Sequence, residues 1–385
     1  MGIHYPQMRL GFDVRPFLKE ETGVGVYFKQ LLSKLAEIDE KNEYFLFSSS
    51  MKDRFDHGKI PAFAKIKFVD LRIPVKIING MWFKWGWPTL DVIFRTNLDL
   101  AHSPTPFPLP TRGKKIVTIH DLFFLDSPDM TDKDAKKIYS RKIQRFLEEA
   151  DGIVAVSHYT AQQLLERFVL DKEKIRIIHH GIDIDEWAAS EGESLERTKA
   201  SFNLPADFLL FVGAHEPRKN IPCLLKALRV VHDRYGKIPL VLVGRMGLDS
   251  AKIEKNIQEL GLDSWVRMVG YVNKAELKHI YKLASVFVFP SLVEGFGIPL
   301  LEAMACDLPI VASRSSAIPE VAQDASVYID PQDPVDLATK IIHVLKDRSL
   351  REKLVSAGKN RVRFFSWEKV ASETLDFYQA IYRRS

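Results

Sequence analysis

The stretch PSLVEGFGIPLLEAMA, residues 290–305, places Glu294 and Glu302 eight positions apart around a glycine-containing turn. The apolar residues before this turn predict a buried strand. Pro299 suits the first position of a following helix, and we expect Glu302 in the first turn of that helix. Free backbone N–H groups and the positive end of a helix dipole suit a phosphate or a sugar hydroxyl, and ionised carboxylates accept hydrogen bonds from hydroxyls. On its own, the spacing also fits one glutamate that only stabilises the helix terminus and another in a solvated turn.

A second turn of the same kind lies upstream in LLFVGAHEPRKNIPCLLKAL, residues 209–228. Here an apolar strand leads through a glycine turn into a helix that begins near Asn220, with Arg218 and Lys219 beside its start. Paired cations at this position can clamp a diphosphate, because arginine offers a fork of donors and lysine a point charge. A lone dibasic pair would more simply be solvated surface, but the presence of both motifs favours a ligand site.

The pattern of apolar residues predicts the elements that must position these motifs. From Met8 onward, short runs rich in Val, Ile and Phe alternate with amphipathic segments, which is typical of βαβ units and parallel sheets. In the first half we expect helices at 26–38 and 132–150, and strands at RLGFD, EYFLF, KIKFVD, KKIVTI and GIVAV. In the second half we expect strands at FLLFVG, PLVLVG, RMVGY, VFVFP, PIVAS and SVYID.

These two series predict an α/β chain with two Rossmann-like, doubly wound parallel-sheet domains. We place the first domain at 1–184, a polar linker at 185–206 and the second domain at 207–366. Ligands of such sheets bind beyond the carboxyl ends of the strands, so we expect the site in the cleft between the domains.

Composition narrows the class of protein. With 385 residues, 46% hydrophobic and 27% charged, the chain has the composition of a globular protein of about two domains. A net charge of +5 favours anionic ligands or a membrane surface over nucleic acid. We expect Cys223 and Cys306 to be buried reduced thiols, and we expect a cytoplasmic, soluble or peripheral protein, because the first residues lack a signal-peptide pattern and no apolar run spans a bilayer.

Taken together, the motifs resemble a known family. The run VGAHEPRKN precedes FPSLVEGFGIPLLEAMACDLPIVAS, while TIHDLFFLDSP, IVAVSHYTAQQLL and the GID at Gly181 come before both. This order, over nearly the whole chain, resembles glycosyltransferase family 4, the retaining enzymes of GT-B fold that use sugar nucleotides. The EPRKN variant is similar to that of bacterial mannosyltransferases.

The resemblance implies roles for the residues of the second domain. Glu294 would contact the hydroxyls of the donor sugar, Glu302 would contact the ribose, and Arg218 and Lys219 would neutralise the diphosphate. Many members have an arginine where this chain has Ala214, so phosphate binding would depend more on those two cations. The remaining donor contacts would come from backbone groups of Phe296, Gly297 and Ile298, and the base contacts from those of Tyr271 and Val272.

In the first domain, the resemblance implies a glycine loop at Gly23 and Gly25, before the helix, that reaches the phosphates. The third glycine of a dinucleotide fingerprint is missing, because Phe28 occupies its position, so a simple tight turn is an alternative. His120, at the end of a strand, would lie near the donor sugar as a catalytic residue, with Asp121 as a weaker candidate. Two further residues have simpler interpretations, namely Ser157 as a helix N-cap and Arg245 as a surface arginine without an assigned role.

The residues offer no secure carboxylate nucleophile for a double displacement, and the family is usually described by a same-face substitution assisted by the leaving diphosphate. We therefore expect positioning and stabilisation of the leaving group, chiefly by Arg218 and Lys219. The DID at 183–185 resembles a metal motif of another glycosyltransferase fold but falls in the predicted linker, so we expect no metal and no cofactor.

The expected activity is hexosyl transfer, with mannose from GDP-mannose as donor, to a saccharide or lipid-linked saccharide in surface polysaccharide (lipopolysaccharide) or glycolipid synthesis. Alternatives are a UDP-glucose or UDP-GlcNAc donor, an epimerase or glycogen-synthase-like polymerase of the same fold, and a binding module without catalysis.

The aromatic and basic residues 72–94, with Trp82, Trp85 and Trp87, suit either a membrane-facing patch or a helix packed on its own domain. By resemblance, the terminal helix at 367–385 would return to the first domain.

Overall fold

The structure is a computed structural model that describes residues 6–17, 23–52, 58, 61–126, 142–189 and 192–384. The chain forms two compact units. Unit 1 comprises Met1–Asp126, Asp132–Gly181 and Trp367–Ser385, and unit 2 comprises Ser127–Thr131 and Ile182–Ser366. Each unit is built around its own parallel sheet, which confirms the predicted α/β class.

Unit 1 contains a seven-stranded sheet in the order β3-β2-β1-β4-β5-β6-β7, and all of its strand pairs are parallel. Its strands are β1 (Arg9–Asp13), β2 (Glu43–Ser49), β3 (Ile66–Leu71), β4 (Leu100–Ser103), β5 (Lys114–Ile119), β6 (Gly152–Ala155) and β7 (Ile175–Ile177). Its helices are α1 (Gly23–Ile38), α2 (Val75–Trp85), α3 (Leu90–Phe94), α4 (Phe123–Asp126), α6 (His158–Arg167) and α16 (Trp367–Tyr382), with short 3-10 turns at Arg15–Phe17 and Lys172–Lys174. The chain order of the strands reverses between β1 and β4.

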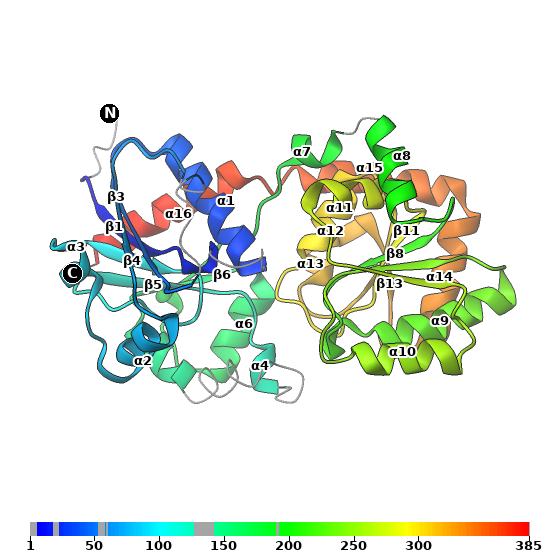
Figure 1. Ribbon diagram of the computed structural model, residues 1–385, viewed down its shortest axis with the longest axis horizontal. Coiled ribbons are helices and arrows are strands. Elements are labelled where there is room, and N and C mark those ends of the chain that lie inside the picture. Colours follow the sequence, from blue (N-terminus) through cyan, green and yellow to red (C-terminus); the bar gives the residue numbers. More distant parts are fainter. Residues whose placement is uncertain are drawn as a thin grey trace. The chain divides into compact units, whose positions relative to one another are not determined.

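The helices of unit 1 cover both faces of its sheet (Figure 1). On one face, α1 and α16 share a core with β1, β2 and β4, in which Phe12, Tyr27 and Tyr378 are fully buried. On the other face, α2 and α3 pack over β2, while α6 packs over β5 and β6. The last helix therefore belongs to the same unit as the first strand.

Unit 2 contains a six-stranded parallel sheet in the order β10-β9-β8-β11-β12-β13, which reverses between β8 and β11. Its strands are β8 (Leu209–Val212), β9 (Leu240–Val243), β10 (Val266–Gly270), β11 (Val286–Phe289), β12 (Ile310–Ser313) and β13 (Ser326–Ile329). Its helices are α7 (Ile184–Ala188), α8 (Gly192–Ser201), α9 (Ile221–Arg234), α10 (Ser250–Glu259), α11 (Lys274–Leu283), α12 (Ile298–Ala305), α13 (Ile318–Ala322), α14 (Pro334–Lys346) and α15 (Arg348–Val362), with 3-10 turns at Pro217–Lys219 and Gln323–Ala325. Helices α9, α10 and α14 pack on one face, and α11 and α12 lie on the other (Figure 1).

Every strand predicted from the sequence is present to within two residues at each end, and two strands were missed. The first, β4, reads LAHS, and β7 has only three residues. The helix predicted at 26–38 extends from Gly23 to Ile38. The helix predicted at 132–150 falls partly outside the described residues, and residues 142–149 are helical.

The region 185–206 differs from the predicted linker. It contains most of α7 and all of α8, and both helices belong to unit 2. Trp187 of α7 is buried and lies edge-on to Tyr281 of α11, with ring centroids 5.8 Å apart. Helix α7 is too short for the spacing of its buried residues to show a helical period in the sequence.

Candidate active site

The turn that follows β11 leads directly into α12. Gly297 caps the helix with φ 103°, a backbone conformation that residues with a side chain rarely adopt. Pro299 lies in the first turn but follows the first helical residue, Ile298, instead of being that residue as predicted. Phe296 is buried, and its ring meets Phe365 edge-on at 5.7 Å. The position expected for Glu302 was wrong, because α12 begins at Ile298 and no acidic residue lies in its first turn.

The two sequence motifs meet in a compact cluster of charges. The Lys219 ammonium lies 2.7 Å from Oε1 of Glu294, and Nη1 of Arg218 donates to Oε2 at 2.9 Å. Arg218 also donates from Nε to Glu216 at 2.8 Å. Only 7% of the Lys219 side chain and 8% of the Glu294 side chain are exposed, so this is a largely desolvated ion pair. The loops after β8 and β11 come together because these strands are neighbours at the reversal of the sheet.

The electrostatics of the cluster keep Glu294 ionised. Burial alone would raise the pKa of Glu294, but the nearby Lys219 and Arg218 outweigh burial and hold the pKa below its usual value. Burial lowers the pKa of Lys219, and the carboxylate opposes this shift. Each carboxylate oxygen has two acceptor positions, so Glu294 can still accept hydrogen bonds from hydroxyl groups.

Glu302 lies in a different environment, beside Tyr281 of α11. The phenol donates a hydrogen bond of 2.8 Å to Oε2 of Glu302. Burial raises the pKa of Glu302 to about 7, and the Tyr281 bond only partly opposes this shift. Burial and the carboxylate together raise the pKa of Tyr281 well above its usual value, so the tyrosine remains the donor. Glu302 is thus a carboxyl group that is about half ionised near neutral pH.

Asn220 and Ser316 hold the two loops in place. Asn220 adopts a left-handed conformation at φ 58°, and its Nδ2 donates to the carbonyl oxygens of Pro290 at 3.2 Å and Pro331 at 2.7 Å. The hydroxyl of Ser316 accepts from the backbone N–H of Glu294 at 2.9 Å. The Asn220 bonds link the start of α9 to the segments that follow β11 and β13, and the Ser316 bond links the segments that follow β11 and β12.

The predicted base-contacting residues follow β10. Tyr271 is 53% exposed, whereas Val272 is buried at 7%. The guanidinium carbon of Arg245, from the loop after β9, lies 4.9 Å from the centre of the Tyr271 ring. Arg245 thus contacts a predicted site residue.

In unit 1, His120 follows the end of β5, as predicted, and lies in a group of aromatic rings. It stacks on His180, with interplanar angle 6° and centroids 5.2 Å apart, and meets Tyr27 of α1 edge-on at 5.0 Å. Its Nε2 lies 3.1 Å from the Pro104 carbonyl oxygen, and its Nδ1 lies 3.4 Å from Nε2 of His180. Gly23 and Gly25 lie in the first turn of α1, rather than in a loop before the helix as expected.

The partners of His120 define its protonation state. Because a carbonyl oxygen only accepts, Nε2 of His120 carries the proton, and Nδ1 then accepts from His180. Burial lowers the pKa of His120 to about 4, although the Pro104 carbonyl opposes the shift, and burial also lowers that of His180. His120 is therefore neutral at physiological pH and not a charged acid there, and both of its ring nitrogens have hydrogen-bond partners.

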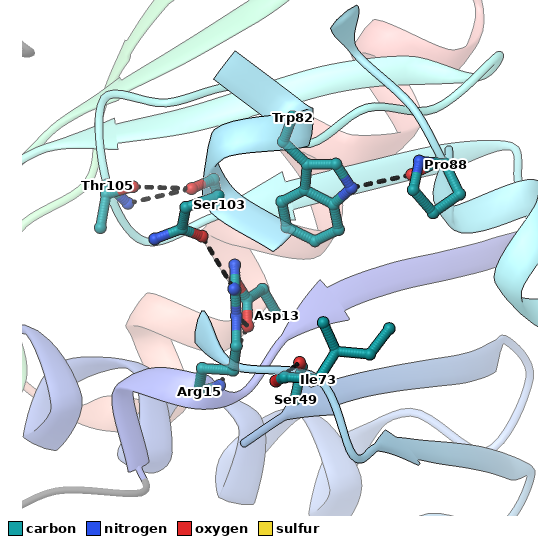
Figure 2. A network of polar contacts seen from close by, with 9 residues as sticks. Asp13, Arg15, Ser49, Ile73, Trp82, Pro88, Ser103 and Thr105 are labelled. Carbon is teal, nitrogen blue, oxygen red and sulfur yellow. Dashed lines mark hydrogen bonds and ion pairs between the residues drawn. The ribbon is translucent and has the colours of Figure 1, made fainter. Parts of the chain in front are cut away.

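A polar network occupies the carboxyl ends of β1, β2 and β4, next to the strand reversal of unit 1 (Figure 2). Arg15 donates from Nε to Asp13 at 2.8 Å and from Nη1 to Asn79 of α2 at 2.8 Å, and its guanidinium lies 4.7 Å from the Trp82 ring. Nearby, Ser103 and Thr105 are 3.0 Å apart between hydroxyls. Ligands of doubly wound sheets bind at such a reversal.

Two family models match the chain side by side. Residues 22–186 match the model described as Glycosyltransferase Family 4, and residues 193–361 match the one described as Glycosyl transferases group 1. The chain is a glycosyltransferase. The enzyme is similar to O-antigen chain mannosyltransferase B of Escherichia coli, with 28% identity over 389 residues that cover 97% of this chain and 100% of the relative. It is also 28% identical over 279 residues to the serotype-specific mannosyltransferase WbdA of Escherichia coli, covering 71% of this chain and 34% of WbdA.

Solved structures show that the glycosyltransferase has the predicted GT-B fold. Sucrose-phosphate synthase of Thermosynechococcus elongatus superimposes with a TM-score of 0.78 at 21% identity, covering 98% of this chain and 100% of that one. WaaG, a glycosyltransferase involved in lipopolysaccharide biosynthesis, superimposes with a TM-score of 0.71 at 16% identity over 96% of this chain and 99% of that one.

Several other residues of the glycosyltransferase serve structural roles. Ser157 is confirmed as the N-cap of α6, where its hydroxyl accepts from the Thr160 N–H at 3.0 Å. Asp183, from the DID sequence, caps α7 by accepting from the Glu186 N–H at 2.9 Å. Cys223 and Cys306 are confirmed as buried free thiols.

The aromatic segment of the glycosyltransferase divides into buried and exposed rings. Trp82 is buried at 3% and donates from its indole to the Pro88 carbonyl at 2.8 Å, which agrees with a helix packed on its own domain (Figure 2). Trp85 and Trp87 are 65% and 55% exposed. Among the helices of the described residues, none combines the length and apolar character that a membrane span requires.

The structure thus brings Arg218, Lys219 and Glu294 together, and it places Glu302 separately against Tyr281. Sequence reasoning missed Tyr281 and His180 as partners of the predicted site residues. Tyr281 lies in an amphipathic helix, where no pattern distinguishes it from a core residue. His180 had a weak signal, because it immediately precedes the GID of the family resemblance.

Proposed function

We propose that this glycosyltransferase transfers mannose from GDP-mannose, with retention of anomeric configuration, to a saccharide or lipid-linked saccharide acceptor in surface polysaccharide or glycolipid synthesis. The observation that carries this proposal is the similarity to O-antigen chain mannosyltransferase B, which extends over 97% of this chain and all of that protein. The partial match to WbdA, also a mannosyltransferase, supports the same donor sugar.

In the proposed donor complex, Arg218 and Lys219 neutralise the diphosphate. Their present partner is Glu294, at 2.9 and 2.7 Å, so the cations already converge on one point before a ligand binds. The remaining acceptor positions of Glu294 take the hydroxyls of the sugar, while the carboxylate of Glu302 takes the ribose hydroxyls. The backbone groups of residues 296–298, at the start of α12, add donors for the sugar and the phosphates.

We infer a same-face substitution rather than a covalent intermediate. Two cations hold the oxygens of Glu294, which makes this carboxylate a poor nucleophile toward an anomeric carbon. The leaving diphosphate accepts the proton of the acceptor hydroxyl, and the protein contributes positioning and fixed positive charge around the leaving group. Side-chain cations can supply that charge without a divalent metal, so transfer should survive excess EDTA. Loss of activity in EDTA with recovery on Mg²⁺ would contradict metal independence.

The proposed acceptor site uses the polar network of unit 1. Asp13, Asn79, Ser103 and Thr105 supply acceptors and donors for sugar hydroxyls, and the charge of Arg15 is already balanced by Asp13 at 2.8 Å. A neutral saccharide hydroxyl therefore suits this surface better than an isolated anion does. The predicted roles of His120, Gly23 and Gly25 toward the donor remain predictions. For lipid-linked acceptors, we propose that Trp85 and Trp87 contact the membrane surface.

The experiment that tests the function uses a panel of GDP-mannose, UDP-glucose, UDP-GlcNAc and UDP-galactose. Binding to the native state raises the melting temperature, and slow hydrolysis of one donor identifies the transferable sugar. We expect both effects with GDP-mannose and loss of hydrolysis in Glu294→Ala. Hydrolysis of a UDP-sugar alone would replace the proposed donor, and binding without hydrolysis or transfer, with a range of saccharide acceptors present, would indicate a binding module. NMR of the product gives its anomeric configuration.

A further inference from the structure

Ser316, in the segment between β12 and α13, has an unusual backbone conformation for a serine. Its φ is 55°, in the left-handed region that residues other than glycine, asparagine and aspartate seldom adopt. Such a conformation costs free energy and persists where the surrounding structure requires it, often at a functional site. The contacts of the hydroxyl therefore indicate why a serine occupies this position.

The Ser316 hydroxyl both donates and accepts a hydrogen bond. It donates to the Ser315 carbonyl oxygen at 2.7 Å, and its oxygen accepts from the backbone N–H of Glu294 at 2.9 Å. The next residue, Ala317, donates its backbone N–H to the Glu294 carbonyl oxygen at 3.3 Å. Residues 316 and 317 thus hold both backbone polar groups of Glu294.

Other contacts anchor the turn on either side of Glu294. Before it, the Leu292 N–H donates to the Arg218 carbonyl oxygen at 2.8 Å, and after it the side chain of Phe296 is only 3% exposed. These contacts fix the loop after β8 and the start of α12 without the help of Ser316. Loss of the Ser316 hydroxyl should therefore affect the position of Glu294 more than that of the groups that face the phosphates.

Binding of a donor makes this support more important. In the free protein, Lys219 and Arg218 hold the Glu294 carboxylate at 2.7 and 2.9 Å, but in the proposed complex the diphosphate competes for the same cations. The position of the side chain then depends more on the backbone bonds from residues 316 and 317. Hydrogen bonds to sugar hydroxyls weaken steeply with distance and angle, so a small shift of the carboxylate would lose them.

We propose that Ser316 is a positioning residue that holds Glu294 against the hydroxyls of the donor sugar. The loop after β12 thereby determines how well the sugar is recognised, whereas binding of the nucleotide depends on other groups. This inference rests on the proposed function, in which Glu294 accepts hydrogen bonds from those hydroxyls.

Ser316→Gly tests this role, because glycine adopts the left-handed backbone readily and lacks the hydroxyl. Hydrolysis is measured with GDP-mannose, or with the nucleotide sugar that the donor panel selects, and titration calorimetry gives the affinity for the corresponding nucleoside diphosphate. We expect kcat/KM for hydrolysis to fall by about tenfold or more. The affinity for the nucleoside diphosphate should equal that of the parent, and melting temperatures check that each variant is folded.

Two further variants separate the hydroxyl from the backbone conformation. Ser316→Ala also lacks the hydroxyl but tolerates the positive φ less well, so it should lose hydrolysis to the same extent and melt at a lower temperature than Ser316→Gly. Ser315→Ala is the matched control, because the Ser315 hydroxyl has no hydrogen-bond partner among the described residues and the carbonyl that Ser316 contacts is kept. This control should hydrolyse the donor as the parent does.

Three results would overturn the proposed role of Ser316. Unchanged hydrolysis in Ser316→Gly would show that the hydroxyl does not position Glu294. An equal loss of hydrolysis and of nucleoside diphosphate affinity would indicate a general structural role, and a loss confined to Ser316→Ala would assign the effect to backbone strain. A parent that hydrolyses no donor would contradict the proposed function together with this inference, whereas failure of this inference alone leaves donor hydrolysis by the parent intact.

Discussion

The ammonium of Lys219 lies 2.7 Å from the Glu294 carboxylate, although 75 residues separate the two in the sequence. They meet because β8 and β11 are neighbours at the point where the strand order of unit 2 reverses. The pair is more than nine-tenths buried, so it contributes little net stability against an apolar alternative. Removal of Glu294 leaves the buried Lys219 without its carboxylate, whereas removal of Lys219 leaves Glu294 paired with Arg218. The cluster is therefore better explained by binding of a charged ligand than by stability.

Removal of either partner should cost both stability and activity. We expect Glu294→Gln to lower the free energy of unfolding by about 3 kcal/mol and Lys219→Met to lower it by less, because Arg218 still pairs with Glu294. The double variant should cost less than the sum of the two. Donor hydrolysis should be lost in all three variants, because restored stability does not restore the ligand contacts. Urea denaturation and hydrolysis assays measure the two effects.

Glu216→Gln is the control for this prediction. Glu216 contacts Arg218 from a position that is 36% exposed, so its loss should cost less than about 1 kcal/mol. Simple additivity of Glu294→Gln and Lys219→Met would show that the two residues are not coupled.

Glu302 should make donor binding depend on pH. Burial raises its pKa to about 7, and ribose hydroxyls donate to the ionised form, so donor binding releases a proton in the acidic range. We expect the affinity for a nucleotide sugar to rise by about tenfold from pH 6 to pH 8 and to level off above that range. The folded pKa exceeds the unfolded value of 4.5, so the same group makes the free protein less stable as pH rises between these two values. Titration calorimetry with an intact nucleotide sugar, whose diphosphate does not titrate in this range, measures the effect.

Two variants identify the source of this pH dependence. Glu302→Gln should remove it, because no carboxyl group titrates. Tyr281→Phe should move it to higher pH, because the phenol hydrogen bond lowers the pKa of Glu302. An affinity that stays constant between pH 6 and pH 8 in the parent would contradict a titrating Glu302 at the donor site.

Most of the strands were predictable because they are buried runs rich in Val, Ile, Leu and Phe, and the ends of these runs also locate the loops. Strands β3 and β10 are only partly buried, but their apolar residues still marked them. β4 was missed because its buried face carries His102, which is held by Tyr378 at 2.6 Å and Thr118 at 2.8 Å. A histidine that satisfies both ring nitrogens inside a core has no signature in a single sequence. Its partner Tyr378 is 276 residues away, on the returning helix α16.

The charged residues of the site could be predicted from the sequence, whereas the residues that hold them in place were harder to predict. Glu294, Arg218 and Lys219 stood out because charged residues beside glycine turns at strand ends have few simple explanations when two such motifs occur together. The start of α12 was misjudged by a residue, since Gly297 with positive φ, rather than Pro299, determines where the helix begins. Tyr281 could not be inferred, because only the packing of α11 against α12 brings it to Glu302.

Asn220 should stabilise unit 2 through its side chain and its backbone conformation. Replacement by alanine removes hydrogen bonds to Pro290 and Pro331, and it puts a residue that tolerates the left-handed region less well than asparagine at φ 58°. We expect Asn220→Ala to lower the free energy of unfolding by about 3 kcal/mol, and Asn220→Gly by about 1 kcal/mol less, since glycine tolerates this conformation. Chemical denaturation of the two variants separates the hydrogen bonds from the strain, and equal losses would mean that strain contributes nothing.

Trp85 and Trp87 should mediate membrane association. Both rings are more than half exposed, Lys84 lies 5.0 Å from the Trp85 ring, and Ile77 in the first turn of the same helix is 54% exposed. Helix α2 and the residues just after it therefore expose aromatic, apolar and cationic groups. Such surfaces partition into the headgroup region of anionic bilayers. We expect co-sedimentation with phosphatidylethanolamine and phosphatidylglycerol vesicles to fall several-fold in the double variant Trp85→Ser, Trp87→Ser, with unchanged donor hydrolysis.

Phe364→Ser is the matched control for this double variant. Phe364 is 61% exposed in unit 2 and its ring lies 5.7 Å from Arg361, yet its replacement should not affect sedimentation. Equal sedimentation of the parent and the double variant would leave these tryptophans as ordinary exposed rings of a helix that Trp82 anchors to its own core.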